Sequence, residues 1–274
     1  MPTPLDKIVG PVVLISMHSL IILSAGYDFG YEWQWTHGHL IPASACAALA
    51  LLAWSRHWRW VGFVTAAIAA WALLGFAIVS FGLMPNSPLA LPTAEFLKSG
   101  AGQVLDIGAG SGRATLMVLL ARPQSQVTVL DRFAAGYGIE ANSPERLLAN
   151  ARVAGVESRI KVQTGDARQM PFAANSFEAA VSTYVIDHLG RTGAAQALTE
   201  INRVLRPDGQ FLLMVINRDI WVKLAYPFLH GHGYFGQMPA RRYWLTSLET
   251  AGLEPLLDGT TPGTLYILAR KKRE

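Results

Sequence analysis

The chain has 274 residues, with 23 Lys or Arg against 19 Asp or Glu and a formal net charge of +4 at pH 7. Charged residues make up 15% and hydrophobic residues 51%, whereas soluble domains carry about 25% charged residues, so this is not the composition of an ordinary soluble domain throughout. The basic residues are scattered apart from the C-terminal RKKRE, which argues against a nucleic-acid-binding surface. The single cysteine, Cys46, excludes an internal disulfide and a cysteine-based metal site.

The first third of the chain is strongly apolar and contains three segments with few charges, residues 8–27, 40–54 and 61–83. A helix rises about 1.5 Å per residue and needs roughly 20 residues to cross a hydrocarbon core of about 30 Å, so the first and third segments are long enough to span a membrane. The second reaches this length when it is extended back through WQWTHGH. We therefore expect residues 1–86 to form a transmembrane region of about three α-helices.

Tryptophans lie at both ends of the second segment. Trp33 and Trp35 precede it, and its end is marked by Trp54, Trp58 and Trp60. Such aromatic belts are typical of the two interfaces of a membrane. Two other interpretations stay open, namely a buried helical hairpin and, for the first segment, a cleaved signal peptide.

From about residue 91 onward, short β-rich runs alternate with amphipathic helical stretches, the pattern of a parallel α/β sheet. The runs are QVLDIG, QVTVLD, IKVQTGD, FEAAVSTYV and QFLLMVI, and helices are expected at about 111–122, 143–154 and 193–205. Two closing runs, EPLLDG and TLYILAR, are joined by a turn with Pro262 and Gly263. We expect residues 87–274 to form a seven-stranded, mostly parallel sheet that ends in an antiparallel hairpin.

A glycine-rich loop, VLDIGAGSGRAT, follows the first of these strands. Gly108, Gly110 and Gly112 allow a sharp turn and a close approach of backbone to ligand, and the helix that opens at Ser111 points its amides at whatever binds. A dinucleotide fingerprint requires Gly or Ala at the next position, where this chain has Arg113. The spacing therefore disfavours a dinucleotide.

Acidic residues follow the next two strands. Asp131 comes about twenty residues after the glycine loop, where a carboxylate can accept both hydroxyls of a ribose, and Asp166 ends the third strand. Each acid alone is compatible with a turn or a helix cap. Because ligands of open α/β sheets bind at the carboxyl ends of the strands, the loop and both acids are expected to line one crevice.

This ordered set of motifs resembles the class I S-adenosylmethionine-dependent methyltransferases, which have a Rossmann-like fold. LDIGAGSG resembles the first motif of that family, GDA its adenine-contacting turn, and INRVLRPDGQFLL its passage into the fifth strand. The resemblance covers roughly residues 91–270 and does not extend to the apolar third. It implies that S-adenosylmethionine is the cofactor.

The resemblance also implies roles for individual residues. Asp106 and the three glycines would hold the methionine portion, and Asp131 would hold the ribose with Arg132 beside it. The adenine would lie against Asp166 and Ala167, and Thr183 would adjoin the cofactor from the fourth strand. The segment RFAAGYGIEANSPE is longer than in many relatives, so the residues that follow Asp131 are not securely aligned.

The fourth strand brings polar side chains to the same crevice in STYVIDHLG. We expect Tyr184, Asp187 and His188 to be catalytic, because a histidine with a pKa of about 6.5 can act as a base while a neighbouring acid fixes its tautomer or acts itself. The alternative is that Asp187 and His188 only cap the following helix and pack against the sheet.

An apolar insertion, residues 217–244, follows the fifth strand. It is expected to contact the substrate through Trp221, Tyr226 and His230. It could be a lid, a helix on the membrane surface, a dimer contact or a packed insertion that completes the core. His230 and His232 have no suitably spaced carboxylate or thiol, so no metal site is expected.

The sequence thus predicts an integral membrane methyltransferase, in the plasma (inner) membrane, for a hydrophobic or membrane-resident acceptor such as a lipid head group, a quinone-like ring or a small apolar metabolite. A non-catalytic S-adenosylmethionine sensor is the alternative, and a nicotinamide-dependent oxidoreductase is a more distant one. Positive-charge counting places the loop with Arg56 and Arg59 in the cytoplasm. A cytoplasmic cofactor instead requires the catalytic domain inside and the N-terminus outside, and we adopt this second orientation. A re-entrant second segment would leave two spans.

Overall fold

The computed structural model of the chain describes residues 26–134, 138–226 and 239–273. Nearly all of the first expected span, residues 8–27, lies outside this part, as do His230 and His232.

The core of the protein is a seven-stranded sheet in the order β3-β2-β1-β4-β5-β7-β6. Strands β1 to β5 all run parallel to one another, and β7 runs antiparallel to both β5 and β6. The strands are β1 (Ala101–Ile107), β2 (Gln124–Asp131), β3 (Ile160–Thr164), β4 (Phe177–Thr183), β5 (Leu205–Ile216), β6 (Leu253–Thr261) and β7 (Thr264–Lys271). The expected mixed sheet with its closing hairpin is confirmed.

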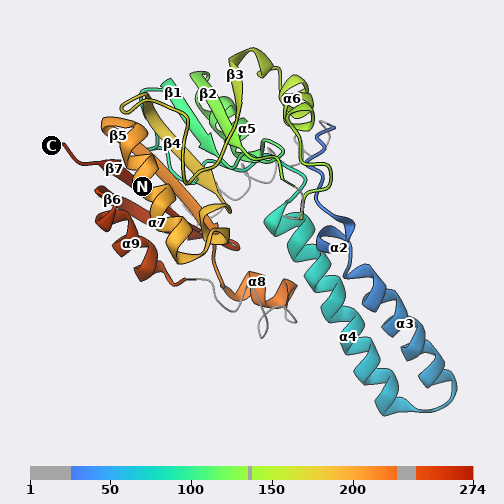
Figure 1. Ribbon diagram of the computed structural model, residues 1–274. Coiled ribbons are helices and arrows are strands. Elements are labelled where there is room, and N and C mark those ends of the chain that lie inside the picture. The colour runs from blue at the N-terminus through green and yellow to red at the C-terminus, as the bar shows by residue number, and fades with distance from the viewer. Residues whose placement is uncertain (1–25, 135–137, 227–238, 274) are drawn as a thin grey trace, which may run out of the picture.

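Helices cover both faces of the sheet, as Figure 1 shows. Their bounds are α5 (Arg113–Ala121), α6 (Pro144–Val153), α7 (Gly190–Val204), α8 (Ile220–Ala225) and α9 (Arg241–Thr250), with the 3₁₀ turns η2 (Glu157–Arg159) and η3 (Ile186–His188). The expected helices at 111–122, 143–154 and 193–205 correspond to α5, α6 and α7. Helix α6 begins where the sequence predicts because the Ser143 hydroxyl accepts the N–H of Arg146 at 3.3 Å and Pro144 fits the first turn.

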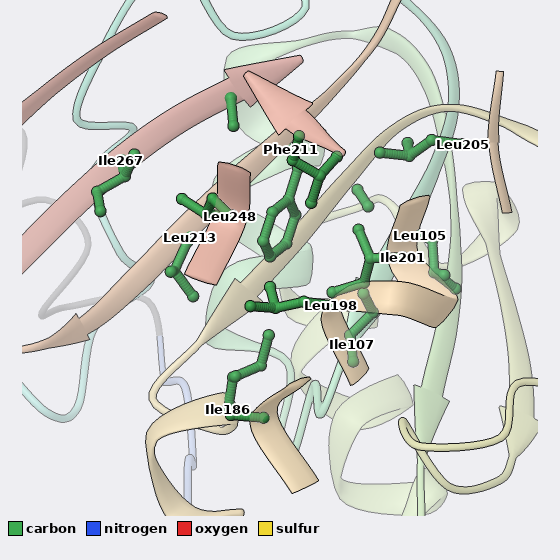
Figure 2. Close-up of a cluster of buried hydrophobic side chains, with 14 of the residues drawn as sticks. Leu105, Ile107, Ile186, Leu198, Ile201, Leu205, Phe211, Leu213, Leu248 and Ile267 are labelled. Carbon is green, nitrogen blue, oxygen red and sulfur yellow. The ribbon is translucent and has the colours of Figure 1, made fainter. Parts of the chain in front are cut away.

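Each face of the sheet has its own hydrophobic core. Leu198 and Ile201 of α7 and Leu248 of α9 pack with Phe211 and Ile267 from the sheet on one face (Figure 2). On the other face, α5 and α6 pack against β1 and β2 through a separate buried cluster. The strands β1 and β4 are buried on both faces, so the ends of these strands are held at fixed positions.

A helical hairpin extends from one end of this domain (Figure 1). It consists of α3 (Leu40–Ser55) and α4 (Arg59–Ala77), which is prolonged by the π-helix η1 (Ile78–Leu83). The continuous helix Arg59–Leu83 has 25 residues and a hydropathy of 2.2, which is long and apolar enough to cross a membrane, whereas α3 has 16 residues. Among the described residues only one helix therefore reaches spanning length, and the expected region of about three spans is not confirmed.

The expected extension of the second apolar segment back through WQWTHGH is wrong. Trp33–Thr36 form a separate short helix, α2, and α3 begins at Leu40. The chain turns between them at Gly38, where an added Cβ would lie 2.3 Å from the carbonyl oxygen of Gln34. A continuous helix from Trp33 is therefore absent, and the second segment stays shorter than a span.

The chain that precedes the hairpin packs against the α/β domain, although the sequence predicts a boundary near residue 86. The Asn150 side chain of α6 accepts the N–H of Asp28 and donates to its carbonyl, both at 2.8 Å, and Phe29 is fully buried. Behind the hairpin, Arg113 donates to the carbonyl oxygens of Ser87 and Met84 at 2.8 and 2.9 Å. Both ends of the hairpin are thus fastened beside the glycine loop.

Candidate active site

The glycine loop lies at the carboxyl end of β1 and leads into α5. Gly108, Gly110 and Gly112 all have positive φ, at 72°, 54° and 97°. A Cβ on Gly108 would lie 2.3 Å from the Val185 side chain, so a larger residue cannot occupy this position without displacing the end of β4. Because the loop keeps its backbone bare, it can approach a ligand closely, as the sequence predicts.

Asp106 lies beneath this loop and is fully buried. One carboxylate oxygen accepts the Thr115 hydroxyl at 2.5 Å, and the other has no hydrogen-bond partner among the described residues. Burial raises its pKa to about 7. The sequence analysis did not single out Thr115, which lies nine residues after Asp106 and is brought to it by the turn of the loop.

Asp131 ends β2 next to the loop. Its carboxylate accepts the N–H of Gly110 at 2.7 Å and the N–H of Phe133 at 2.5 Å. A carboxylate has about four acceptor positions, so two remain for further donors. A ribose offers two neighbouring hydroxyl donors, and the residues present therefore fit the sugar of an adenosyl group.

Asp166 is engaged in an ion pair with a residue that the sequence analysis did not select. Arg168 donates to its two oxygens at 2.9 and 2.6 Å, and Arg132 lies 4.0 Å away. The hydrogen bond from Arg168 is the main reason why the pKa of Asp166 falls to about 2. Arg168 follows within GDARQ, and its position two residues after the acid was the available signal.

The two remaining cofactor candidates lie at the same end of the sheet. Ala167 follows Asp166 and packs against the core on the α7 side. Thr183 is the last residue of β4 and is half-buried.

Tyr184 and Asp187, two of the three residues expected to be catalytic, follow β4 and have different hydrogen-bond partners. The Tyr184 hydroxyl forms a 2.5 Å hydrogen bond with the Thr264 hydroxyl, and burial raises its pKa. Asp187 accepts the N–H of Ile216 at 3.2 Å with one oxygen, while its other oxygen is buried with no partner in the described part of the chain. Burial raises the pKa of Asp187 to about 6, which is below the value of about 7 that burial gives Asp106.

His188 follows in the 3₁₀ turn η3. Burial lowers its pKa to about 4, so the imidazole is neutral at pH 7. Helix α7 begins at Gly190 with Leu189 at the N-cap position and no side-chain cap. Neither Asp187 nor His188 therefore caps this helix, and Asp187 instead links the end of β4 to β5.

Two residues missed by the sequence analysis lie beside Tyr184. The Arg113 guanidinium is 5.5 Å from the centre of the Tyr31 ring, and both are close enough to Tyr184 for their charges to act on its pKa. Tyr31 comes from the segment before the hairpin, and Arg113 comes from the first turn of α5. In the sequence, Arg113 indicates only that the loop does not fit a dinucleotide.

Two of the three residues expected to contact substrate, Trp221 and Tyr226, lie in the described part of the chain. The Tyr226 hydroxyl donates to the carbonyl oxygen of Trp35 at 2.7 Å, and the two rings meet edge to face with centroids 6.1 Å apart. Trp221 lies on α8 and is 45% exposed. The third residue, His230, is outside the described residues.

The geometry agrees with comparisons to known proteins. Residues 105–213 match a family model described as a methyltransferase domain. Over these residues the chain is similar to that family. A SAM-dependent methyltransferase of known structure from Methanosarcina mazei aligns with a TM-score of 0.52 at 19% identity, covering 68% of this chain and all of that one. An O-methyltransferase family 2 protein from Planctomyces limnophilus aligns with a TM-score of 0.50 at 18% identity, covering 84% of this chain and 61% of that one.

Curated relatives are similar over the same part of the chain. The ubiquinone/menaquinone biosynthesis C-methyltransferase UbiE of Desulfotalea psychrophila is 32% identical over 137 residues, which is 50% of each protein. An uncharacterized protein of Escherichia coli, YafE, is 32% identical over 116 residues, or 39% of this chain and 53% of that one. The chain thus spans about half the length of these relatives. S-adenosylmethionine is the cofactor of the domain, which agrees with the bare glycine loop and the two open acceptor positions of Asp131.

Proposed function

We propose that the protein is a membrane-attached methyltransferase that transfers a methyl group from S-adenosylmethionine to a hydrophobic or membrane-resident acceptor. The observation that carries this proposal is that the cofactor loop and an apolar helical hairpin lie next to each other. A glycine loop braced by Asp131 lies directly beside an apolar helical hairpin, and Arg113 bonds to the chain at the end of that hairpin.

The reaction requires the chain to orient the acceptor, exclude water and accept a proton where the acceptor loses one. The bound cofactor supplies an electrophilic methyl group on a sulfonium. Asp187 is the better candidate base, because a pKa of about 6 keeps it ionised at pH 7 while leaving it appreciably basic. His188, with a pKa of about 4, is a weak base. The Tyr184 hydroxyl is bonded to the Thr264 hydroxyl, and burial raises its pKa, so it is a poorer candidate base than Asp187.

The acceptor class that we favour is a quinone-like ring with an apolar tail. The name of the Desulfotalea psychrophila relative supports such a ring and supports carbon as the accepting atom. When a hydroxylated ring is methylated at carbon, the new C–C bond forms as the bond from methyl to sulfur breaks, and the ring then loses a proton. The Asp187 carboxylate takes up that proton.

The surface of the hairpin supports membrane attachment. In the helix Arg59–Leu83, 28% of the most apolar 18-residue window is buried against the rest of the protein. Large exposed apolar side chains cover the hairpin, among them Leu51, Trp58, Trp60, Phe63, Val64 and Leu73. Exposed apolar surface on this scale is typical of a membrane or protein contact and argues against the buried-hairpin interpretation.

The arrangement of the hairpin also supports the adopted orientation. Its two ends lie at the α/β domain, and its tip carries Arg56 and Arg59 at the far end (Figure 1). Residues 26–32 contact the domain, so the chain before the hairpin and the domain lie on the same side of any bilayer that the hairpin enters. A cytoplasmic cofactor then places the domain in the cytoplasm at the plasma membrane and the Arg56 and Arg59 tip on or toward the opposite side.

The decisive experiment measures cofactor binding and methyl transfer with the full chain in lipid nanodiscs. Calorimetry should show binding of S-adenosylmethionine, and radiolabelled methyl should pass from it to a component of a membrane lipid extract. Binding without transfer to any extract component would favour the non-catalytic sensor. No detectable binding would refute the enzyme proposal.

A further inference from the structure

Helix α8 is fixed between the sheet and the base of the hairpin. The Asp219 carboxylate accepts the N–H groups of Trp221 and Val222 at 3.0 and 3.1 Å, which starts the helix. Its second oxygen accepts the N–H of Gly263 in the turn between β6 and β7 at 2.8 Å. The position of α8 relative to the carboxyl edge of the sheet is therefore set by hydrogen bonds.

The other end of α8 is fixed to the hairpin. His39 Nε2 donates to the carbonyl oxygen of Ala225 at 2.5 Å. Ala225 is buried with Ile78 and Val79 of η1. A Cβ on Gly75 would lie 3.5 Å from the same Ala225 carbonyl, so α4 approaches α8 closely at this glycine. Gly75 and His39 thus mark the position along the hairpin at which it leaves the α/β domain.

The outer side of α8 is apolar and exposed. Ile220 is 59% and Trp221 is 45% exposed. On a helical wheel Trp221 adjoins the buried Ala225, and Ile220 lies between Lys223 and the half-buried Leu224. Lys223 lies on the remaining side and is exposed. The apolar side of this helix is therefore wider than its contact with the hairpin, and the uncovered part continues the apolar surface of the hairpin.

Other exposed aromatic residues lie at the base of the hairpin. Trp33 on α2 is exposed, and Phe81 on η1 is 72% exposed. Indole rings prefer the interface between lipid and water, where the ring is partly desolvated and its N–H keeps a polar partner. Trp33 and Trp221 therefore stand on elements that meet at the base of the hairpin, where such an interface is expected.

The length of the hairpin beyond α8 agrees with this placement. Sixteen residues separate Arg59 from Gly75, and α3 has 16 residues, so each helix extends about 24 Å beyond the level of α8. The hydrocarbon core is about 30 Å thick. A hairpin of this length that starts within the head groups carries its tip, with Arg56 and Arg59, through most of the core.

We propose that α8 is an interfacial helix, which lies in the head-group layer with Ile220 and Trp221 against lipid and sets the depth to which the hairpin enters the bilayer. This inference rests on the proposed membrane attachment. Its functional consequence follows from chain connectivity, because β5 leads directly through residues 217–219 into α8. The carboxyl edge of the sheet therefore faces the membrane surface, and the acceptor is an amphipathic molecule whose reacting group lies at its polar end.

Site-directed spin labelling tests this placement, since Cys46 is the only cysteine of the chain. In a Cys46→Ala background, a nitroxide is attached at Trp221→Cys on the outer side of α8 and, separately, at Lys223→Cys on its polar side. Phe63→Cys reports on the hairpin, and Leu256→Cys, exposed on β6, is the control in water. Each labelled protein is reconstituted in vesicles of phosphatidylcholine with phosphatidylglycerol.

The collision rates with oxygen and with a water-soluble nickel chelate give the depth of each label. We expect label 221 in the head-group layer, label 63 deep in the hydrocarbon, and label 256 in water. If label 63 is deep but label 221 behaves like label 256, α8 is not interfacial and only the membrane attachment survives. If label 63 is in water, the attachment itself is wrong. Ile220→Cys repeats the measurement on the same side of α8 should the Trp221 variant no longer bind cofactor.

Discussion

The carboxylate of Asp131 accepts the backbone N–H of Gly110 at 2.7 Å, so the acid after β2 holds the glycine loop after β1 in place. The two residues pair across 21 positions of sequence because β1 and β2 are parallel neighbours whose carboxyl ends meet. The acid thus supports the loop, and we propose that its second task is to offer its remaining acceptor positions to a ribose.

These two tasks can be separated by substitution. Asp131→Asn keeps an acceptor for Gly110 but loses one of the oxygens that a ribose needs, whereas Asp131→Ala loses both. We expect the affinity for S-adenosylmethionine to fall by about tenfold for Asp131→Asn, the loss of about 1.4 kcal/mol that one hydrogen bond to a charged group contributes, and to fall further for Asp131→Ala. Calorimetric titration of the two variants checks this order, and equal affinities for both variants and the parent would refute the assigned role.

The bare backbone at Gly108 leads to a second prediction. Its φ is 72°, and an added Cβ would meet the Val185 side chain at 2.3 to 2.8 Å. Gly155 is the matched control, because its φ is 68° and an added Cβ would meet nothing within 4 Å. We expect Gly155→Ala to cost about 1 kcal/mol of unfolding free energy, the strain of the left-handed backbone alone, and Gly108→Ala to cost about 2 to 4 kcal/mol because overpacking is added. Denaturant unfolding of both variants measures the difference, and similar losses would contradict the clash with Val185.

A third prediction concerns the pH dependence conferred by Asp187. Its pKa is about 6 in the folded protein and 3.8 without the fold, so the folded state holds the proton more tightly. Stability is therefore lost as the pH rises from about 4 to about 6, and the buried carboxylate costs about 3 kcal/mol above that range. Asp187→Asn should remove this loss, making the variant more stable than the parent at pH 8 but not at pH 4.

The same substitution should slow methyl transfer. A general base contributes roughly 10² to 10⁴ in rate, so we expect Asp187→Asn to lose at least about 100-fold in turnover with unchanged cofactor affinity. Unfolding at pH 4 and pH 8, together with a radiolabel assay, tests both effects. A variant that gains stability but keeps full turnover would show that Asp187 is not the base.

The sheet and the cofactor crevice follow from the sequence because they depend on local patterns. Each strand is a short apolar run, and the loop, Asp131 and Asp166 each stand immediately after one of them. The surroundings of each acid, in contrast, come from residues that are distant in the sequence. Asp187 owes its raised pKa to burial, which outweighs the lowering by its hydrogen bond from the N–H of Ile216, 29 residues away. No periodicity in the sequence reveals that contact.

The hairpin shows the same limit. Its apolar composition indicates membrane helices, but the sequence does not reveal that Tyr226 bonds to Trp35 across 191 positions and holds α8 against its base. Hydropathy also joins WQWTHGH to α3, because it does not register the turn at Gly38. Contacts over such distances decide which parts of an apolar segment are free to meet lipid.

The final prediction concerns the attachment of the chain before the hairpin to the methyltransferase domain. Asn150 is 2% exposed and makes three hydrogen bonds, two with the backbone of Asp28 and one, at 3.0 Å, with the carbonyl of Ser111 beside the glycine loop. Asn150→Ala leaves these buried backbone groups unpaired, and we expect it to cost about 2 to 4 kcal/mol of unfolding free energy. We also expect faster hydrogen exchange at the amides of residues 28–31. Cofactor binding should weaken as well, because the Asn150 side chain bonds both to Asp28 and to Ser111 beside the glycine loop.

Arg146→Ala is the matched control for this test. It removes the ion pair with the exposed carboxylate of Asp28 but keeps all three hydrogen bonds of Asn150. Because one partner of the ion pair is largely in water, we expect it to cost about 0 to 1 kcal/mol and to leave hydrogen exchange at Asp28 nearly unchanged. If both variants loosen residues 28–31 equally, the ion pair rather than Asn150 fastens this segment. If Asn150→Ala loosens the segment without weakening cofactor binding, the chain before the hairpin is anchored to α6 but does not act on the glycine loop.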